Sequence, residues 1–200
     1  SGTLFGSMSN KFPAGFFGET ITHTSAYTGN PSHMKIRRMS PSDLPQVLRI
    51  QGECYDKGIL ESVDSFSAKL SAVPEFCFIA LQGEKAVGYV ISLPWAFGGI
   101  PALNGTEYTV PASADSLCIH DLAVAPTARK AGVARHLMEA VFDTARHQRY
   151  RQIFLVAVQG ASSFWKCQGF EIMQADEMLQ RSLSAYGADA EFMVKTEAHF

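Results

Sequence analysis

The sequence is poor in several features that would point to particular classes of protein. Its 17 Lys and Arg residues nearly balance its 19 Asp and Glu residues, which leaves a formal net charge of -2. This balance argues against binding to nucleic acid or to an anionic membrane surface, because both need an excess of positive charge. No apolar run reaches the roughly 18 residues of a membrane-spanning helix, and the N-terminus lacks the pattern of a secretory signal. The sequence therefore favours a soluble protein.

Cysteine is also scarce and scattered. The four cysteines are Cys54, Cys77, Cys118 and Cys167. None of them lies in a C-x-x-C motif or at the Cys/His spacing of a zinc site, which argues against a disulfide framework and against a metal site. Reduced thiols are typical of the cytoplasm, so we expect a cytoplasmic protein without a metal.

The first 33 residues differ from the rest of the chain. Ser, Thr, Gly and Asn are dense there, no periodicity is sustained, and the letters SHM precede a sharp change at Met34. We interpret residues 1–33 as an expression leader, with a poorly structured natural arm as the alternative. The remaining residues, 34–200, have the length and apolar content of a single domain.

Alternating strand and helix patterns follow Met34. Strands are predicted at residues 35–39, 76–81, 85–93, 117–124, 152–158, 170–175 and 190–194, and helices at residues 40–51, 62–70, 133–145 and 162–168. The second and third strands flank a glycine turn, which predicts an antiparallel hairpin. The fourth and fifth strands, with the helix between them, predict a βαβ unit with parallel strands. The sequence thus predicts an α/β fold.

The segment between the fourth strand and its helix combines positive charge with small side chains. It consists of Arg129, Lys130, Ala131, Gly132, Val133 and Ala134. The first N–H groups of a helix lack partners within the helix, and the helix dipole attracts anions there. The segment matches neither the P-loop pattern nor the dinucleotide-binding glycine pattern. It therefore predicts a phosphate site of another kind.

Two motifs of the sequence resemble those of a known family. Leu122-Ala123-Val124 followed by Arg129-x-x-Gly132-x-Ala134 resembles the acetyl-CoA-binding motif of the GNAT superfamily of N-acetyltransferases. The letters GASSFWKCQGF, residues 160–170, are similar to the A-x-x-F-Y-x-x-x-G-F segment of that family. The order of strands and helices from residue 34 to the C-terminus also fits. The resemblance leaves out residues 1–33.

The resemblance implies a fold and a cofactor. It implies a single domain with a mixed, mostly antiparallel sheet of about seven strands, a central parallel βαβ unit and flanking helices. It also implies that the fourth strand diverges from the fifth, with the pantetheine arm of acetyl-CoA in the gap and the diphosphate at the helix start. The implied cofactor-binding residues are Leu122, Ala123, Val124, Arg129, Lys130, Ala131, Gly132, Val133, Ala134, Gln159, Ser163, Phe164, Trp165 and Lys166.

The activity implied by the resemblance is N-acetyl transfer. Acetyl-CoA would supply the acetyl group, and a primary amine of a small molecule or peptide would accept it by direct attack. The letters IHDLAV, FW in place of FY, and YGADAEFM together resemble a bacterial subfamily whose acceptors are mostly unassigned. A non-catalytic acyl-CoA sensor and a phosphate-binding α/β protein unrelated to CoA are the alternatives. Exposed sheet edges favour a homodimer.

The fourth strand departs from the family pattern at the position of the catalytic base. Cys118 stands where the family often has a catalytic glutamate, and it is more typical of a small core residue than of a nucleophile. His120 can replace the glutamate as the base, or it can be a histidine held by a backbone carbonyl. Strand alternation predicts Cys118, His120 and Leu122 on one face and Ile119, Asp121 and Ala123 on the other. Asp121 can hold a substrate ammonium, although a local pairing role is favoured.

A second departure is Trp165, which stands where the family usually has a tyrosine that protonates the thiolate. An indole is no practical acid, so Tyr186 becomes the candidate, with a packed aromatic as the alternative reading. A thiol with an ordinary pKa near 8.5 also leaves with little need for a dedicated acid. The long loop after the third strand bears Trp95, Asn104 and Tyr108, which we expect to roof the acceptor pocket unless the loop is only a surface excursion.

Overall fold

The computed structural model describes residues 34–196, so the interpretation of residues 1–33 lies outside the described residues. One sheet of seven strands, in the order β1-β2-β3-β4-β5-β7-β6, forms the centre. Its strands are β1 (Met34–Arg38), β2 (Cys77–Gln82), β3 (Lys85–Trp95), β4 (Ser116–Val124), β5 (Gln152–Ala157), β6 (Glu171–Ile172) and β7 (Glu191–Thr196). The helices are α1 (Leu44–Cys54), α2 (Val63–Ala72), α3 (Val133–His147), α4 (Ser162–Cys167) and α5 (Glu177–Leu183).

The strand pairing confirms the predicted topology. The pair β4 and β5 is parallel, and the other neighbours in the sheet are antiparallel. The parallel pairing covers only Leu117–Ile119 of β4 against Ile153–Leu155 of β5. From His120 onwards β4 has no register with β5, so its edge on that side is free to face a ligand.

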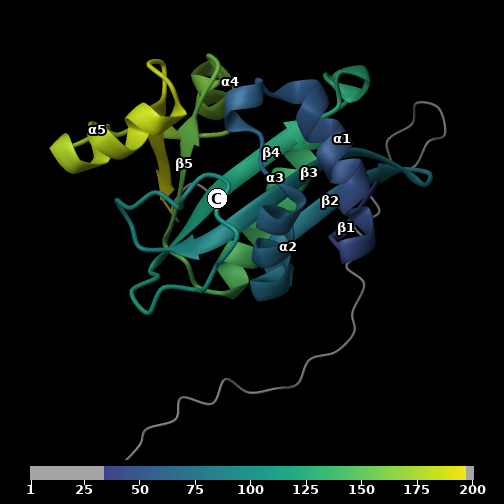
Figure 1. The fold of residues 1–200 in the computed structure, drawn as a ribbon, viewed down its shortest axis with the longest axis horizontal. Helices are drawn as coiled ribbons and strands as arrows, with labels where there is room; N and C mark the ends of the chain where they lie inside the picture. The colour runs from purple at the N-terminus through teal and green to yellow at the C-terminus, as the bar shows by residue number, and fades with distance from the viewer. Residues whose placement is uncertain (1–33, 197–200) are drawn as a thin grey trace, which may run out of the picture.

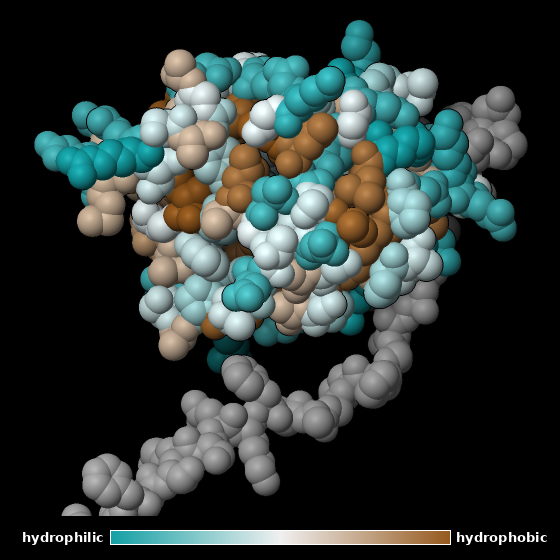
Figure 2. All heavy atoms as spheres, in the orientation of Figure 1, coloured by the Kyte–Doolittle hydropathy of each residue, from teal (hydrophilic) through white to brown (hydrophobic). Residues whose placement is uncertain are grey.

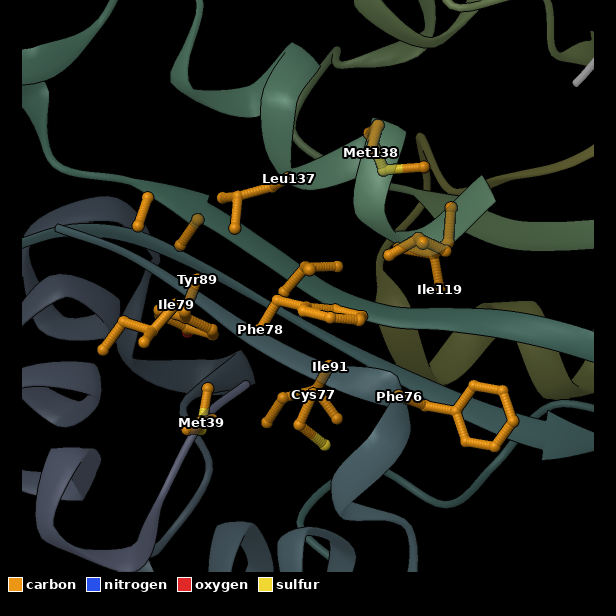
Figure 3. Close-up of a cluster of buried hydrophobic side chains, with 14 of the residues drawn as sticks. Met39, Phe76, Cys77, Phe78, Ile79, Tyr89, Ile91, Ile119, Leu137 and Met138 are labelled. Carbon is orange, nitrogen blue, oxygen red and sulfur yellow. The ribbon is translucent and has the colours of Figure 1, made fainter. Parts of the chain in front are cut away.

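Helices cover both faces of the sheet (Figure 1). In Figure 3, Leu137 and Met138 of α3 lie on one side of the strands, whereas Met39 and Cys77 lie on the other side, toward α1 and α2. The predicted apolar stripe of α3 is buried at Val133, Leu137, Met138, Val141 and Ala145. Burial of such a stripe is what holds an amphipathic helix on a sheet.

Capping side chains mark where the helices begin. The N–H and Oγ of Ser40 both donate to Asp43 Oδ2, and this carboxylate also pairs with Arg37. Ser62 accepts a hydrogen bond from Ser65 N at the start of α2, as an N-cap residue does. The long strand predicted at residues 170–175 is wrong, because only Glu171–Ile172 pair with β7.

A β-bulge corrects the predicted alternation of β4. Ile91 of β3 is opposite Asp121, and the next residue, Ser92, is opposite Ile119, so His120 has no partner in the ladder. A residue inserted in this way turns two consecutive side chains toward the same side. The prediction that Asp121 lies on the opposite face from His120 is therefore wrong. Both side chains contact groups from the α1–α2 side of the sheet.

Among the described residues, no helix has the length and apolar character needed to cross a bilayer. On the face shown in Figure 2, hydrophobic residues are interspersed among hydrophilic ones. The four cysteines are all free, and Cys77 and Cys118 are buried.

Candidate active site

A cavity of about 780 Å³ runs along the free edge of β4. One end is formed by the residues between Ala128 and Arg135 at the start of α3, except Ala131, and we call it the donor end. The other end is formed by Ile59, Glu61, Leu103, His120 and Tyr186, which we call the acceptor end. Residues 121–124 of β4 line the wall between the two ends, opposite Leu155 and Val156 of β5. The cavity is thus a channel between the diverging strands.

The donor end presents backbone N–H groups. The first hydrogen bond of α3 runs from the N–H of His136 to the carbonyl of Gly132, at 3.2 Å. The N–H groups of Val133, Ala134 and Arg135 precede that bond and have no acceptor within the helix. These N–H groups, together with the positively charged side chains of Arg129 and Lys130, can bind an anion.

Gly132 shapes the donor end through its backbone. Its φ is +77°, in the left-handed region that a side chain disfavours. A Cβ built on Gly132 would have only the ring of His136 within 4 Å, so the space in front of this backbone is open. A Cβ would fill part of that space, which is where a phosphate can reach the N–H groups. The residues present therefore fit the diphosphate of a CoA thioester.

The carbonyl groups of β4 are contacted from the end of α1. Cys54 Sγ donates to the carbonyl of Val124 at 3.3 Å, and Tyr55 Oη lies 2.7 Å from the carbonyl of Leu122. Tyr55 Oη also lies 2.8 Å from Asp121 Oδ1, and Tyr89 donates to Asp121 Oδ2 at 2.6 Å. These contacts give Asp121 a local pairing role.

Asp121 has an unusual protonation equilibrium. Burial raises its pKa to about 6, although the hydroxyl groups of Tyr89 and Tyr55 act in the opposite direction. Tyr55 carries a single proton, so it cannot donate to both the carbonyl of Leu122 and an ionised Asp121. When Asp121 is protonated, its hydroxyl donates to Tyr55 and Tyr55 donates to Leu122. The hydrogen-bond geometry around Tyr55 and the raised pKa of Asp121 thus both favour a protonated Asp121.

The acceptor end contains a buried charged network around Glu61. His120 Nε2 lies 2.8 Å from Glu61 Oε1, and Lys69 Nζ lies 2.9 Å from Glu61 Oε2. The side chains of His120 and Glu61 are 3% exposed and that of Lys69 is 2% exposed. Burial alone would raise the pKa of Glu61, but the hydrogen bonds and charges of His120 and Lys69 lower it to about 2. Glu61 is therefore a carboxylate at neutral pH.

The loop after β3 is held beside the acceptor end by hydrogen bonds between side-chain and backbone atoms. The N–H of Asn104 donates to Glu61 Oε1, and Asn104 Oδ1 accepts from the N–H of Ser62, both at 2.8 Å. Tyr186 Oη donates to the carbonyl of Pro101 at 2.9 Å. Leu103 is the residue of this loop that lines the cavity.

Trp95 and Tyr108 pack on each other away from the cavity. Their rings are stacked with centroids 6.0 Å apart, and Tyr108 donates to the carbonyl of Pro94. Neither ring lines the cavity, and the same holds for Asn104. Their predicted contact with the acceptor stays a prediction, while the loop itself supplies Leu103.

The two departures from the family pattern have structural explanations. Cys118 lies in an apolar cluster with Phe154 and Phe192, and burial raises its pKa well above the usual value for a thiol. A protonated thiol in such surroundings is a poor nucleophile. Trp165 is buried and makes edge contacts with Phe164 and Phe170, with centroids 5.0 and 5.4 Å away. Its ring packs into the wall of the cavity.

The structure gathers most of the predicted site residues around the cavity. Those that line it are His120, Asp121, Leu122, Ala123, Val124, Arg129, Lys130, Gly132, Val133, Ala134, Gln159, Phe164, Trp165 and Tyr186. Ala131, Ser163 and Lys166 do not line it. Among the described residues, no group of three or more His, Cys, Asp and Glu side chains is arranged to hold a metal ion.

Three residues of these hydrogen-bond networks were not found by the sequence analysis. Glu61, Lys69 and Tyr55 lie far from both motifs in the chain. A weak signal exists for Lys69, because it follows Phe66 by three residues and so lies near the apolar side of α2. Glu61 directly precedes the cap residue Ser62, and nothing in its neighbours indicates that it is buried.

Comparisons with known proteins agree with this fold. The loading GNATL domain of CurA from Lyngbya majuscula is similar at 12% sequence identity and a TM-score of 0.67, over 84% of this chain and 100% of that chain. The GphF GNAT-like decarboxylase in complex with isobutyryl-CoA is similar at 16% identity and a TM-score of 0.64, over 81% and 98%. The ribosomal-protein-S18-alanine N-acetyltransferase from Escherichia coli is similar at 16% identity and a TM-score of 0.59, over 82% and 94%.

At these identities the solved structures establish the fold alone. A search of curated protein sequences found no relative. The family model described as "Acetyltransferase (GNAT) family", however, matches residues 44–170, which is more than half of the chain. The predicted family and fold are confirmed, and the chain belongs to the GNAT family of acetyltransferases.

Proposed function

We propose that this protein is an acetyl-CoA-dependent N-acetyltransferase that acts on a primary amine of a small molecule or peptide. The observation that carries the proposal is the continuity of the cavity. It joins an anion-binding helix start at Gly132 to a buried histidine, His120, along the free edge of β4. CoA and acyl-CoA are bound by neighbours of the same fold, as in the GphF complex with isobutyryl-CoA.

The start of α3 would hold the diphosphate, and the free edge of β4 would hold the pantetheine arm. The N–H groups of Val133 and Ala134 and the cations of Arg129 and Lys130 supply hydrogen bonds and charge. Leu122 and Val124 offer backbone groups along the arm, and Trp165 offers an apolar wall. Once bound, acetyl-CoA supplies a thioester carbonyl as the acetyl donor.

His120 would remove the proton that the amine must lose. An alkylamine with an ordinary pKa near 10.4 is almost entirely protonated at neutral pH, so the site has to deprotonate it. The neutral nitrogen then forms a bond to the carbonyl carbon, and the bond from this carbon to sulfur breaks. The nitrogen loses two protons in all. His120 takes the first from the ammonium before the attack and releases it to bulk water. It then takes the second from the acylated nitrogen and returns it through water to the leaving sulfur. N–H groups of β4 can stabilise the negative charge on oxygen.

Tyr186 and Asp121 are better suited to hold the site together than to transfer protons. Tyr186 donates to the carbonyl of Pro101, and burial raises its pKa above the usual value. Asp121 accepts from Tyr89 and shares a proton with Tyr55. The assignment of Tyr186 to thiolate protonation and of Asp121 to the substrate ammonium therefore has less support than that of His120 as the base.

A panel assay tests the function. The purified protein is incubated with acetyl-CoA and alkylamines, polyamines, amino acids or peptides, and released CoA is measured by chromatography. Chromatography is preferable to a thiol reagent, because the exposed Cys167 would react with the reagent. We expect CoA release with at least one amine and its loss in the His120→Gln variant.

Three results would overturn this proposal. Tight CoA binding without turnover of any amine would indicate a non-catalytic acyl-CoA sensor, the alternative that Cys118 and Trp165 favour. Failure to bind CoA at all would remove the donor end from the argument. One structural neighbour is named a decarboxylase, so the panel also includes a carboxylated acyl-CoA, and release of carbon dioxide from it alone would point to that reaction.

A further inference from the structure

We propose that Glu61 is a positioning residue for His120, which fixes the imidazole with its proton on Nε2 and leaves Nδ1 to accept the proton of the amine. The chemical role rests on the proposed function. The arrangement of the ring does not, and it can be tested without any turnover.

The first step of the argument is that every group on the Glu61 carboxylate is a donor. Oε1 accepts from the N–H of Asn104 at 2.8 Å and from Lys69 Nζ at 3.1 Å. Oε2 accepts from Lys69 Nζ at 2.9 Å and from Ser65 Oγ at 3.3 Å. An ionised carboxylate accepts hydrogen bonds and donates none. The remaining partner, His120 Nε2 at 2.8 Å from Oε1, must therefore carry a proton.

The second step concerns the other ring nitrogen. A neutral imidazole with its proton on Nε2 has a lone pair on Nδ1. Within the described residues, Nδ1 of His120 has no hydrogen-bond partner, and His120 lines the cavity. Nδ1 is thus the nitrogen that remains for a ligand. Lys69 holds Glu61 in place, so the ring orientation is determined before an amine enters.

The third step concerns charge. Glu61 and Lys69 together are neutral, so His120 gains a proton next to a dipole rather than next to a lone anion. The other titratable groups around it are Asp121, which follows it in β4, and Tyr186 at the acceptor end. Because the oxygens of Glu61 are already engaged, we expect Glu61 not to bind the substrate ammonium. The amine is then held by the rest of the cavity and meets the charge network only through His120.

Removing the negative charge of Glu61 and removing the positive charge of Lys69 should move the acidic limb of the kcat/KM profile in opposite directions. Glu61→Gln keeps the size of the side chain and removes the anion, so the protonated ring loses stabilisation and the acidic limb of the kcat/KM profile moves to lower pH. Lys69→Met removes the cation and leaves the anion, so the same limb moves to higher pH. We also expect Glu61→Gln to lower kcat/KM roughly 100-fold, because an amide can donate to Nε2 and select the wrong tautomer.

Two matched variants act as controls. Asp43→Asn removes another buried carboxylate, which pairs with Arg37 outside the cavity. Lys195→Met removes another buried lysine, which lies over the ring of Phe142. Both are expected to lower the free energy of unfolding without moving the acidic limb. A purely structural role of Glu61 would make its variants behave like these two.

Nitrogen-15 NMR of the histidine rings provides the readout that needs no activity. The His120 signals are identified by their absence from His120→Gln. We expect the wild-type ring and the Lys69→Met ring to carry the proton on Nε2, and Glu61→Gln to show a mixture of tautomers. If Glu61→Gln does not fold with Lys69 unpaired, the double variant Glu61→Gln/Lys69→Met replaces it.

The wild-type spectrum alone can overturn this inference. A neutral His120 ring with its proton on Nδ1 would contradict it, and so would an unchanged tautomer in Glu61→Gln or in the double variant. If no amine is acetylated, the proposed function fails while the tautomer result still decides the positioning role. If turnover is found and the two charge variants move the acidic limb in the same direction, the positioning role fails while the function stands.

Discussion

The two ends of the cavity are built from different parts of the chain. The donor end is a contiguous segment in which backbone N–H groups meet the solvent beside Gly132. The acceptor end gathers side chains from four separate segments, represented by Glu61, Leu103, His120 and Tyr186, and those of Glu61 and His120 are buried. A contiguous backbone site can be recognised from a sequence motif, and we expect it to contribute little to stability. A site of buried charges cannot be recognised in that way, and we expect the stability of the fold to depend on it.

The largest effect expected from this difference is on stability. Glu61→Leu leaves Lys69 as an unpaired charge in the interior, so we expect the free energy of unfolding to fall by about 3 to 5 kcal/mol. The matched control is Glu53→Leu, because Glu53 pairs with Arg49 at 2.7 Å but is 39% exposed. We expect less than about 1 kcal/mol there, because water screens an exposed pair.

Urea denaturation measures both values. Glu61→Leu/Lys69→Leu should recover most of the stability lost in the single variant, because no unpaired charge is left. Equal losses from Glu61→Leu and Glu53→Leu would show that burial of the Glu61–Lys69 pair adds nothing to its contribution to stability.

The same contrast explains what could be predicted from the sequence. The seven strands, the parallel pair and the donor end were predictable because each rests on local periodicity or on a contiguous motif. The network of Glu61, Lys69 and His120 joins residues that are up to 59 positions apart. Charged residues are rarely buried, so composition and periodicity place them on the surface by default.

Two local features were not predicted from the sequence. Helix α5 was missed, although Asp176 caps it by accepting from the N–H of Leu179, and Leu179 and Leu183 are spaced by four residues. The short length of α5 hid this signal behind the strand predicted just before it. The bulge at His120 had no signal, because it depends on the register between β3 and β4. A shift of one residue changes which side chains share a face, and only pairing reveals it.

The second effect concerns the donor end and should appear in binding. Gly132→Ala places a Cβ in the open space before the N–H groups, so we expect CoA affinity to fall roughly 30-fold, about the loss of one charge-assisted hydrogen bond. Gly83→Ala is the matched control, because Gly83 also has a positive φ, of +62°, and lies in the turn between β2 and β3.

Calorimetry with CoA measures the affinity of both variants, and thermal unfolding measures their stability. Both should lose about 1 kcal/mol of stability, because an L-residue disfavours the left-handed region. Unchanged CoA affinity in Gly132→Ala would show that phosphate binds elsewhere.

The third effect is the pH dependence of stability, in which two carboxyl groups that line the cavity, those of Glu61 and Asp121, act with opposite signs. The pKa of Glu61 is lowered to about 2, so its contribution is present above its ordinary value of 4.5 and is lost as the pH falls toward 2. The pKa of Asp121 is raised from 3.8 to about 6, so its contribution is complete below pH 3.8 and is lost as the pH rises through 6.

Asp121→Asn isolates the second contribution. We expect wild-type stability to decline by about 1 to 2 kcal/mol between pH 4 and pH 6 because of Asp121, and the variant to lack that decline. Urea denaturation at several pH values measures both proteins. A variant that kept the full decline would place the titrating group elsewhere.

The smallest effect is expected at Tyr186. Its hydroxyl donates to the carbonyl of Pro101, and its raised pKa makes proton transfer to a thiolate unfavourable. We therefore expect Tyr186→Phe to lower kcat less than about threefold and stability by about 1 kcal/mol. Tyr108→Phe is the matched control, because Tyr108 donates to the carbonyl of Pro94 and lies outside the cavity, with a pKa that burial also raises.

Kinetic measurements on these two variants decide whether the acceptor end supplies an acid. If Tyr186→Phe lowers kcat tenfold while Tyr108→Phe does not, the hydroxyl of Tyr186 acts in the reaction despite its raised pKa. If both variants lose similar stability and little activity, Tyr186 only packs against the loop after β3 and takes no part in the reaction. The departing thiol, with an ordinary pKa near 8.5, then takes its proton from water, and His120 is left as the one residue of the acceptor end that we expect to exchange protons with the substrates.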